Sequence, residues 1–166
     1  MTFRPTLSTQ LTVTTVLVSV VLLSLGIFLL ALSHQYRDRG GVHYVFLGSG
    51  TLMLLLLVGS LSFRIRSYEI NSGNLIIKVG FGEKTFPLKN LQDIRVEERP
   101  FAGARKDMGV GGLWSYYGHF TNPRWGKFLA YATDSSRGVL LVWPDKQVLI
   151  TPADAPLFIQ SAKSSQ

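Results

Sequence analysis

The sequence predicts a membrane α-helical hairpin followed by a mainly β domain of about seven strands that ends in one helix. Two apolar runs, residues 11–32 and 44–63, contain no Asp, Glu, Lys or Arg. Each run is about twenty residues long, which as an α-helix matches the roughly 30 Å of a bilayer's hydrocarbon core. The later residues form short apolar segments separated by turn residues, a pattern typical of strands. We therefore divide the chain into a transmembrane hairpin at residues 1–66 and a polar domain at residues 67–166.

Each apolar run carries small residues on one helical face. Thr15, Ser19 and Gly26 share a face in the first run, and Gly48 and Gly59 share a face in the second. Small residues let helices approach closely in lipid, where no hydrophobic driving force acts between them. We expect these two faces to pack on each other; the alternative is that one of them docks on another membrane subunit.

The charges beside the apolar runs indicate an orientation. Arg4, Arg64 and Arg66 lie at the outer ends of the hairpin, whereas the connecting loop carries Arg37 and Arg39. By the positive-inside rule, this small bias places the N-terminus and the polar domain in the cytoplasm. A cleaved signal peptide is the alternative for the first run. The single arginine before it and an apolar run longer than roughly 7–15 residues argue against cleavage.

Eight segments of the polar domain have strand character. They are residues 67–70, 75–79, 84–88, 94–98, 115–120, 127–133, 138–143 and 147–151. The Asn-Ser-Gly-Asn sequence at residues 71–74 predicts a tight hairpin turn between the first two. Residues 99–113 are rich in glycine and charge, and we expect them to form a long loop. Thr151 is a candidate N-cap for a final helix whose apolar side begins at Leu157.

Short aromatic and glycine motifs follow one another in a definite order through the polar domain. They are Tyr68-Glu69-Ile70 with Leu75-Ile76-Ile77, Phe86-Pro87-Leu88, Asp93-Ile94, Met108-Gly109, Tyr117-Gly118-His119-Phe120, Gly126-Lys127-Phe128 and Val148-Leu149-Ile150-Thr151-Pro152. In this order they resemble the bacterial pleckstrin-homology (PH)-like family, whose members often follow transmembrane helices. The resemblance implies a partly open β-barrel or sandwich capped by the C-terminal helix, with no enzymatic activity. We accordingly expect a multi-pass protein of the bacterial inner membrane.

The composition excludes several kinds of chemistry. Cysteine is absent, so disulfides and thiolate catalysis are excluded. Gly109, Gly111 and Gly112 lack the lysine spacing of a phosphate-binding loop. His119 is the single histidine of the polar domain, and adjacent Glu97 and Glu98 would point to opposite faces of a strand. We therefore expect no enzyme, no cofactor, no metal site and no small-molecule substrate.

The net charge bears on the choice of partner. Residues 64–166 carry 14 Lys and Arg against nine Asp and Glu, a net charge of +5. These cations are scattered, which argues against nucleic acid and suits an anionic lipid surface. Lipid-binding PH domains carry cations at their first hairpin turn, whereas residues 71–74 carry none. This departure argues against headgroup binding at that turn.

Residues 99–125 contain the best candidates for contact with a partner or with lipid, because they combine cations with aromatic rings. The candidates are Arg99, Phe101, Arg105, Lys106, Trp114, Arg124 and Trp125. For the aromatic residues the alternative is packing inside the domain. We expect a non-catalytic, membrane-tethered interaction module, either a scaffold or an accessory or assembly subunit of a larger membrane complex. Its partners would be membrane lipids and other membrane protein subunits. The alternative is a sensor that binds anionic lipid.

Overall fold

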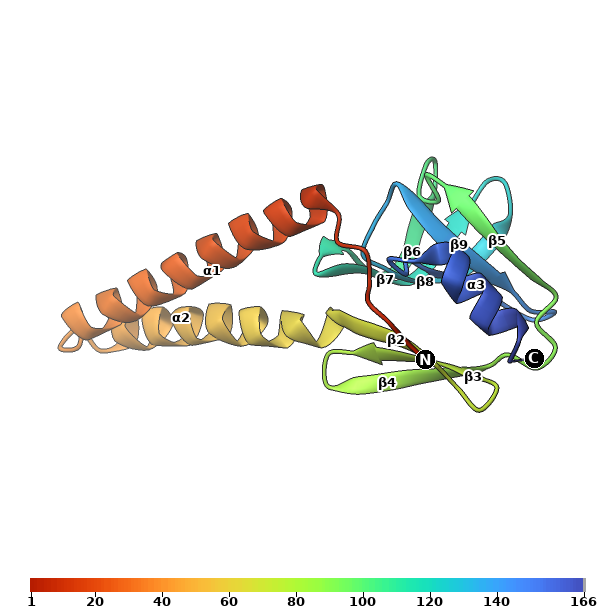
Figure 1. The fold of residues 1–166 in the computed structure, drawn as a ribbon. Coiled ribbons are helices and arrows are strands. Elements are labelled where there is room, and N and C mark those ends of the chain that lie inside the picture. Colours follow the sequence, from red (N-terminus) through yellow and green to blue (C-terminus); the bar gives the residue numbers. More distant parts are fainter. Residues whose placement is uncertain (166) are drawn as a thin grey trace.

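The structure, a computed structural model, describes residues 1–165 as a helical hairpin joined to a β domain (Figure 1). The hairpin consists of α1 (Thr9–Gln35) and α2 (Gly41–Ser60), followed by the short 3-10 helix η1 (Leu61–Phe63). Both α1 and the continuous helix of residues 41–63 are long and apolar enough to cross a membrane. Only 11% of each apolar stretch is buried, unlike the core helix of a soluble protein. The predicted membrane hairpin is therefore confirmed at the level of length, composition and exposure.

The β domain contains two sheets within the described residues. The first has the strand order β1 (Thr2–Phe3), β2 (Ile65–Asn71), β3 (Asn74–Val79) and β4 (Gly82–Pro87). The second has the order β5 (Asp93–Glu98), β9 (Arg137–Val142), β10 (Gln147–Ile150), β8 (Gly126–Ala132), β7 (Ser115–Asn122) and β6 (Arg105–Leu113). Neighbouring strands are antiparallel except β8 and β10, which are parallel. Among the described residues, the outermost strands are β1 and β4 in the first sheet and β5 and β6 in the second, and each pairs with one neighbouring strand only.

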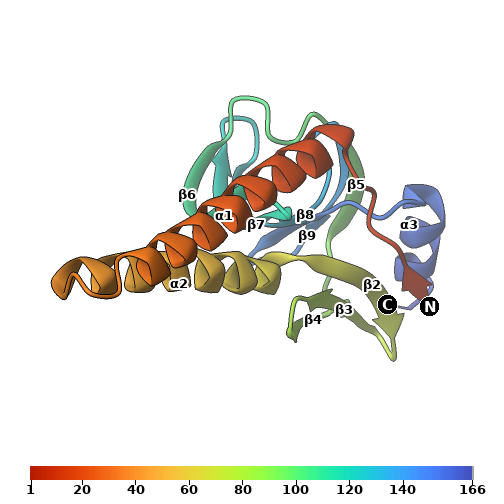
Figure 2. The same ribbon diagram turned by 90° about the vertical axis from the view of Figure 1, so that its left-hand side faces the viewer.

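The main core lies between the two sheets and beneath the C-terminal helix α3 (Ala155–Lys163), which covers one end of the domain (Figure 2). Phe158 of α3 is fully buried and meets Phe3 edge to face, with ring centroids 5.2 Å apart. Alternation of buried and exposed residues along β2 and β3 turns one face of the first sheet toward this core. The expected strand-rich domain with a capping helix is confirmed.

The segment that precedes α1 belongs structurally to the β domain. β1 pairs with β2, and Pro5 forms an isolated antiparallel bridge with Pro152, just after β10. The amide of Thr6 also donates to the carbonyl of Thr151, over 2.8 Å. This segment therefore joins the edge of one sheet to the other. It is too short to show a strand-like alternation, and the sequence did not indicate it.

The prediction of a loop over residues 99–113 is wrong for most of this segment, because residues 105–113 form the edge strand β6. Its glycines permit a close approach to β7. Gly109 pairs with Gly118, and their φ angles are +132° and +122°. A Cβ atom on Gly118 would lie 2.3 Å from the carbonyl oxygen of Met108. Only glycine fits both the conformation and the space, so these glycines mark a bulged strand pair and not a loop.

The beginning of α3 also differs from the prediction. Asp154, and not Thr151, is the N-cap, and its carboxylate accepts a 3.0 Å hydrogen bond from the amide of Leu157. Pro156 lies in the first turn, where its missing amide hydrogen costs nothing. Thr151 is fully buried instead and bonds to the Tyr68 hydroxyl. Thr151, which the sequence predicted as the N-cap, therefore belongs to a buried polar cluster.

The two helices cross at Gly26 and Gly50. A Cβ atom on Gly26 would lie 3.0 Å from Leu54, and one on Gly50 would lie 2.9 Å from Leu30. The expectation that Gly48 and Gly59 face α1 is wrong, because a Cβ atom on either would meet nothing within 4 Å. The face of α2 that contacts α1 is the one that contains Gly50, and Gly48 and Gly59 point outward. Composition alone does not distinguish two helical faces that both carry small residues.

Candidate functional site

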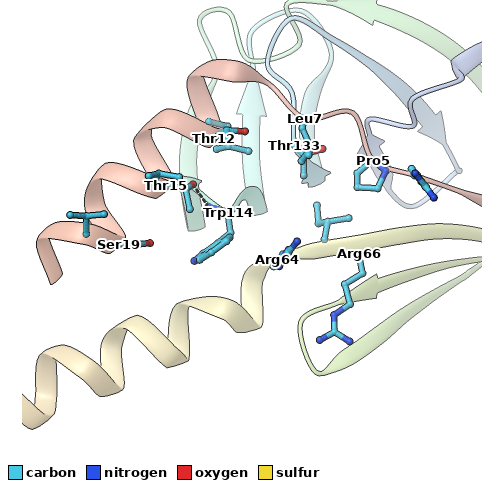
Figure 3. A pocket seen from close by; sticks show the side chains of 14 residues that line it. Pro5, Leu7, Thr12, Thr15, Ser19, Arg64, Arg66, Trp114 and Thr133 are labelled. Carbon is cyan, nitrogen blue, oxygen red and sulfur yellow. Dashed lines mark hydrogen bonds between the residues drawn. The ribbon is translucent and has the colours of Figure 1, made fainter. Parts of the chain in front are cut away.

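The junction between the hairpin and the β domain is built around Trp114, in the tight turn between β6 and β7. Its backbone amide donates to the Thr15 hydroxyl of α1 over 3.0 Å, and its indole Nε1 donates to Ser60 Oγ of α2 over 2.8 Å. The Arg64 guanidinium lies 5.8 Å from the centre of the indole ring. Trp114 therefore contacts both helices at the end where α1 and α2 separate (Figures 1 and 3).

Further hydrogen bonds connect η1 and Arg64, which follow α2, to both sheets. Ser115 Oγ donates to the carbonyl of Phe63 over 2.6 Å, and the amide of Gly80 donates to the carbonyl of Arg64 over 2.7 Å. A Cβ atom on Gly80 would lie 2.3 Å from the carbonyl oxygen of Ser62, so the β3–β4 turn lies directly against η1. The β domain is thus held in one orientation relative to the membrane helices.

A cavity of about 530 Å³ lies in this junction, between α1 and the start of β2 (Figure 3). Apolar side chains of α1 and of the segment before it form one wall, with Leu11, Val16 and Val20 among them. Thr12, Thr15 and Ser19 of α1 and the residue Trp114 line the cavity as well. Three arginines, Arg4, Arg64 and Arg66, also line the cavity, and no Asp or Glu does. The lining of the cavity is therefore largely apolar, and its charged residues are all arginines.

The exposed edge of β6 is a second candidate site. Arg105 and Lys106 are exposed, and Met108 is 71% exposed. Between them, Asp107 accepts hydrogen bonds from Thr121 Oγ1 (2.6 Å) and from Arg105 Nε (3.1 Å). These bonds, chiefly the one from Thr121, lower the pKa of the Asp107 carboxyl below its usual value. The edge therefore presents charges of both signs beside an exposed methionine.

The candidate contact residues take different places in the structure. Phe101 stacks on Tyr116, with centroids 4.4 Å apart, inside a second small core that Trp125 also contacts. Trp114 is engaged by the hairpin. Arg99 and Arg124 are exposed in two turns that Asn122 brings together, since its side-chain amide donates to the carbonyl of Pro100 over 2.9 Å. The cations therefore remain available for contact, and their role stays a prediction.

A fully buried tyrosine hydroxyl stabilises the core. The Tyr68 hydroxyl is fully buried, donates to the carbonyl of Tyr131 over 2.7 Å and accepts from the amide of Thr151 over 3.2 Å. Burial raises the pKa of Tyr68 to about 12. Burial likewise raises the pKa of Tyr131 to about 12. These groups lie in the core and join the two sheets, and Thr151 connects the Tyr68 hydroxyl to Thr133, which lines the junction cavity.

Sequence reasoning noticed the arginines of the cavity only as indicators of orientation. Arg4 and Arg64 are separated by the whole hairpin, and the structure brings them to one cavity. Thr15 was predicted as a helix-packing residue; it is buried, but its hydroxyl bonds to Trp114. Among residues 1–165, no group of three or more His, Cys, Asp or Glu side chains is placed to hold a metal ion.

Two sheets capped by a C-terminal helix, behind two helices long and apolar enough to cross a membrane, fit a membrane-associated PH-like protein. The family model described as Bacterial PH domain matches residues 66–166, more than half of the chain. The chain therefore belongs to the bacterial PH domain family, as the sequence motifs predicted. Neither the curated proteins nor the solved structures contain a significant match to it.

Proposed function

We propose that this protein is a non-catalytic, membrane-tethered PH-like interaction module that acts as a scaffold or accessory subunit in a larger membrane protein complex. The fixed attachment of the β domain to the hairpin through Trp114 carries this proposal. A domain held in one orientation presents the same surface to every neighbour in the membrane. Tethering also raises its effective concentration near membrane partners.

The β6 edge is the surface that we assign to a protein partner. An unpaired strand edge offers backbone groups to another chain, and Met108 adds an adaptable apolar contact. The negative charge of Asp107 beside Arg105 and Lys106 suits a protein surface of mixed charge better than a uniformly anionic membrane. The rings of Phe101 and Trp125 pack inside the domain, which leaves the edge without aromatic residues to insert into lipid.

The proposed test is extraction of the full-length protein from its native membrane in mild detergent. The wild type is compared with Lys106→Glu/Met108→Asp, which changes the β6 edge, and with Phe81→Asp. Phe81 is 76% exposed in the β3–β4 turn and serves as the control. We expect a membrane protein at a fixed ratio with the wild type and with Phe81→Asp, and at least a tenfold loss with the β6 variant. Extraction with lipid alone would contradict the proposal and favour the lipid-sensor alternative.

We also propose that the protein lies in the bacterial inner membrane with its β domain in the cytoplasm. Arg4, Arg64 and Arg66 lie together at the domain end of the hairpin, and this supports the orientation. Cysteines introduced at Ser72 and at Gly40 are treated with a membrane-impermeant reagent in intact cells. We expect Gly40→Cys to be labelled and Ser72→Cys to be protected. The reverse result would contradict the cytoplasmic placement.

A further inference from the structure

The junction cavity lies where an amphiphilic molecule of the bilayer would meet the protein. α1 has 27 residues, about 40 Å, and therefore exceeds the roughly 30 Å hydrocarbon core. The Trp114 indole, a group that favours the membrane–water interface, lies beside Thr15 and Ser60 near the domain end of both helices. The cavity extends from this level along α1 to Ser19 and Val20, which is the direction of the bilayer interior.

The apolar part of the cavity opens to the surroundings of the hairpin. Val16 is 54% exposed and Val20 is 58% exposed, although both line it. In a membrane these side chains face acyl chains, so a chain can enter the cavity sideways along α1. A water-soluble ligand would gain nothing from this wall.

The charged residues that line the cavity are all arginines, and Arg64 lies over the Trp114 ring. Arg4 and Arg64 line the cavity from two segments that are far apart in the sequence, and Arg66 follows Arg64 closely along the chain. No carboxylate among residues 1–165 forms an ion pair with any of the three. An uncompensated group of arginines favours a phosphate, which accepts charge-assisted hydrogen bonds from guanidinium groups.

The hydroxyl groups that line the cavity add a third indication. Ser19 Oγ has no exposed surface and no hydrogen-bond partner within the described part of the chain. It projects from α1 beside the cavity (Figure 3). A serine in a membrane helix normally bonds to its own helix, as Ser24 does with Val20. Because this oxygen is covered, a glycerol or ester oxygen of a lipid would supply the missing partner once the Ser19 side chain rotates into the cavity that it lines.

We propose that the junction cavity binds one anionic phospholipid, with its phosphate at Arg4 and Arg64 and an acyl chain along Val16 and Val20. The lipid would lie in the space between α1 and β2, beside Trp114. This site is distinct from the first hairpin turn at residues 71–74, where no cation is present. It does not depend on a protein partner at the β6 edge.

The headgroup test uses the full-length protein in nanodiscs that contain phosphatidylglycerol and phosphatidylcholine, with bound lipid counted by native mass spectrometry. Each cation near an anionic headgroup favours binding about fivefold. We therefore expect Arg4→Gln/Arg64→Gln to reduce the preference for phosphatidylglycerol about twentyfold, and Arg4→Lys/Arg64→Lys to retain most of it. The control Arg37→Gln/Arg39→Gln removes the same charge from the loop at the other end of the hairpin. An equal loss in this control, or no preference in the wild type, would overturn the proposal.

A second pair of variants tests the acyl-chain wall without changing charge. Val16→Trp fills the cavity, whereas Leu17→Trp lies on a face of α1 that is 62% exposed and does not line it. We expect Val16→Trp alone to reduce bound phosphatidylglycerol about fivefold or more. Excess glycerol phosphate should not displace the lipid. Equal binding by both variants, or displacement by glycerol phosphate, would mean that the site binds a free phosphate group and not a lipid.

Discussion

In the helical hairpin the large apolar side chains point outward, whereas in the β domain they point inward. Leu17 and Phe28 of α1 are more than half exposed, and the helices touch where Gly26 and Gly50 lack side chains. In the β domain, Phe158 is fully buried beneath the capping helix. The two helices of the hairpin therefore pack closely because glycines at the crossing point leave room. The β domain is instead held together by large side chains packed in its core.

The junction between the hairpin and the β domain is held both by a packed side chain and by hydrogen bonds. Trp114 contributes a large ring to a space between the helices, and its two hydrogen bonds reach α1 and α2. Polar bonds at this position couple two parts that would otherwise move independently. A few directional contacts therefore fix the orientation of the β domain relative to the hairpin. Four predictions test the β domain, the hairpin and the junction.

The largest effect is expected at the β6–β7 pair of the domain. Gly118→Ala places a Cβ atom 2.3 Å from the Met108 carbonyl and at a φ of +122°. We expect a loss of about 3 kcal/mol or more, measured by thermal unfolding of the full-length protein followed by near-ultraviolet circular dichroism. Gly112→Ala is the control, because its φ is +100° but no atom lies within 4 Å. Equal losses would show that backbone conformation alone, and not the close approach, requires glycine here.

A second substitution tests the crossing point of the hairpin. Gly50→Ile drives a side chain into Leu30 and the backbone of Gly26, and we expect it to separate the helices and cost about 1–3 kcal/mol. Electron–electron distances between spin labels at Val13 and Val58, both on exposed faces, should lengthen. Gly48→Ile, which meets nothing within 4 Å, should leave that distance unchanged. If Gly48→Ile instead removes a protein partner, the outward face of α2 is a docking face, the alternative that the sequence left open.

The third prediction concerns the junction. Trp114→Ala removes the indole ring and its hydrogen bond to Ser60 Oγ, worth about 2 kcal/mol together, and keeps the backbone amide that donates to Thr15. We expect a broad distribution of distances between spin labels at Val20 and Met108, with little change in the unfolding of the β domain itself. Trp125→Ala should give the opposite result, because Trp125 packs on the second core and not on the hairpin. An unchanged distance distribution in Trp114→Ala would mean that other contacts fix the orientation.

The smallest effect concerns alkaline pH, which acts on the domain alone. The folded pKa of Tyr68 is raised to about 12 from an ordinary value of 10.0, because burial disfavours the charged phenolate. A raised folded pKa contributes stability that is fully present below pH 10 and is lost as pH rises toward 12. We expect the free energy of unfolding to fall by about 1 kcal/mol per pH unit in this window for each such tyrosine. Tyr68→Phe should reduce this slope by about half, since Tyr131 remains; an unchanged slope would contradict this assignment.

The elements of this protein follow largely from local patterns. The two apolar runs, the hairpin turn at residues 71–74 and the eight strand segments required only composition, alternation and turn residues. The charge pattern of the sequence also identified the cations at residues 99–124 as candidates for contact with a partner. The strand at residues 105–113 was missed because its glycines, read along the chain, resemble a loop. Their function is visible only when β7 lies opposite, with Gly118 against Gly109.

Local sequence patterns predict two membrane-length helices and a strand-rich, PH-like domain with a capping helix. Periodicity and apolar length are properties of neighbouring residues, so one chain segment suffices to reveal them. The packed face of each helix, the position of Trp114 and the shared cavity of Arg4 and Arg64 are visible only in the folded chain. Each of these joins residues that are far apart along the chain, and such proximity arises from the folding of the whole chain and not from any local pattern.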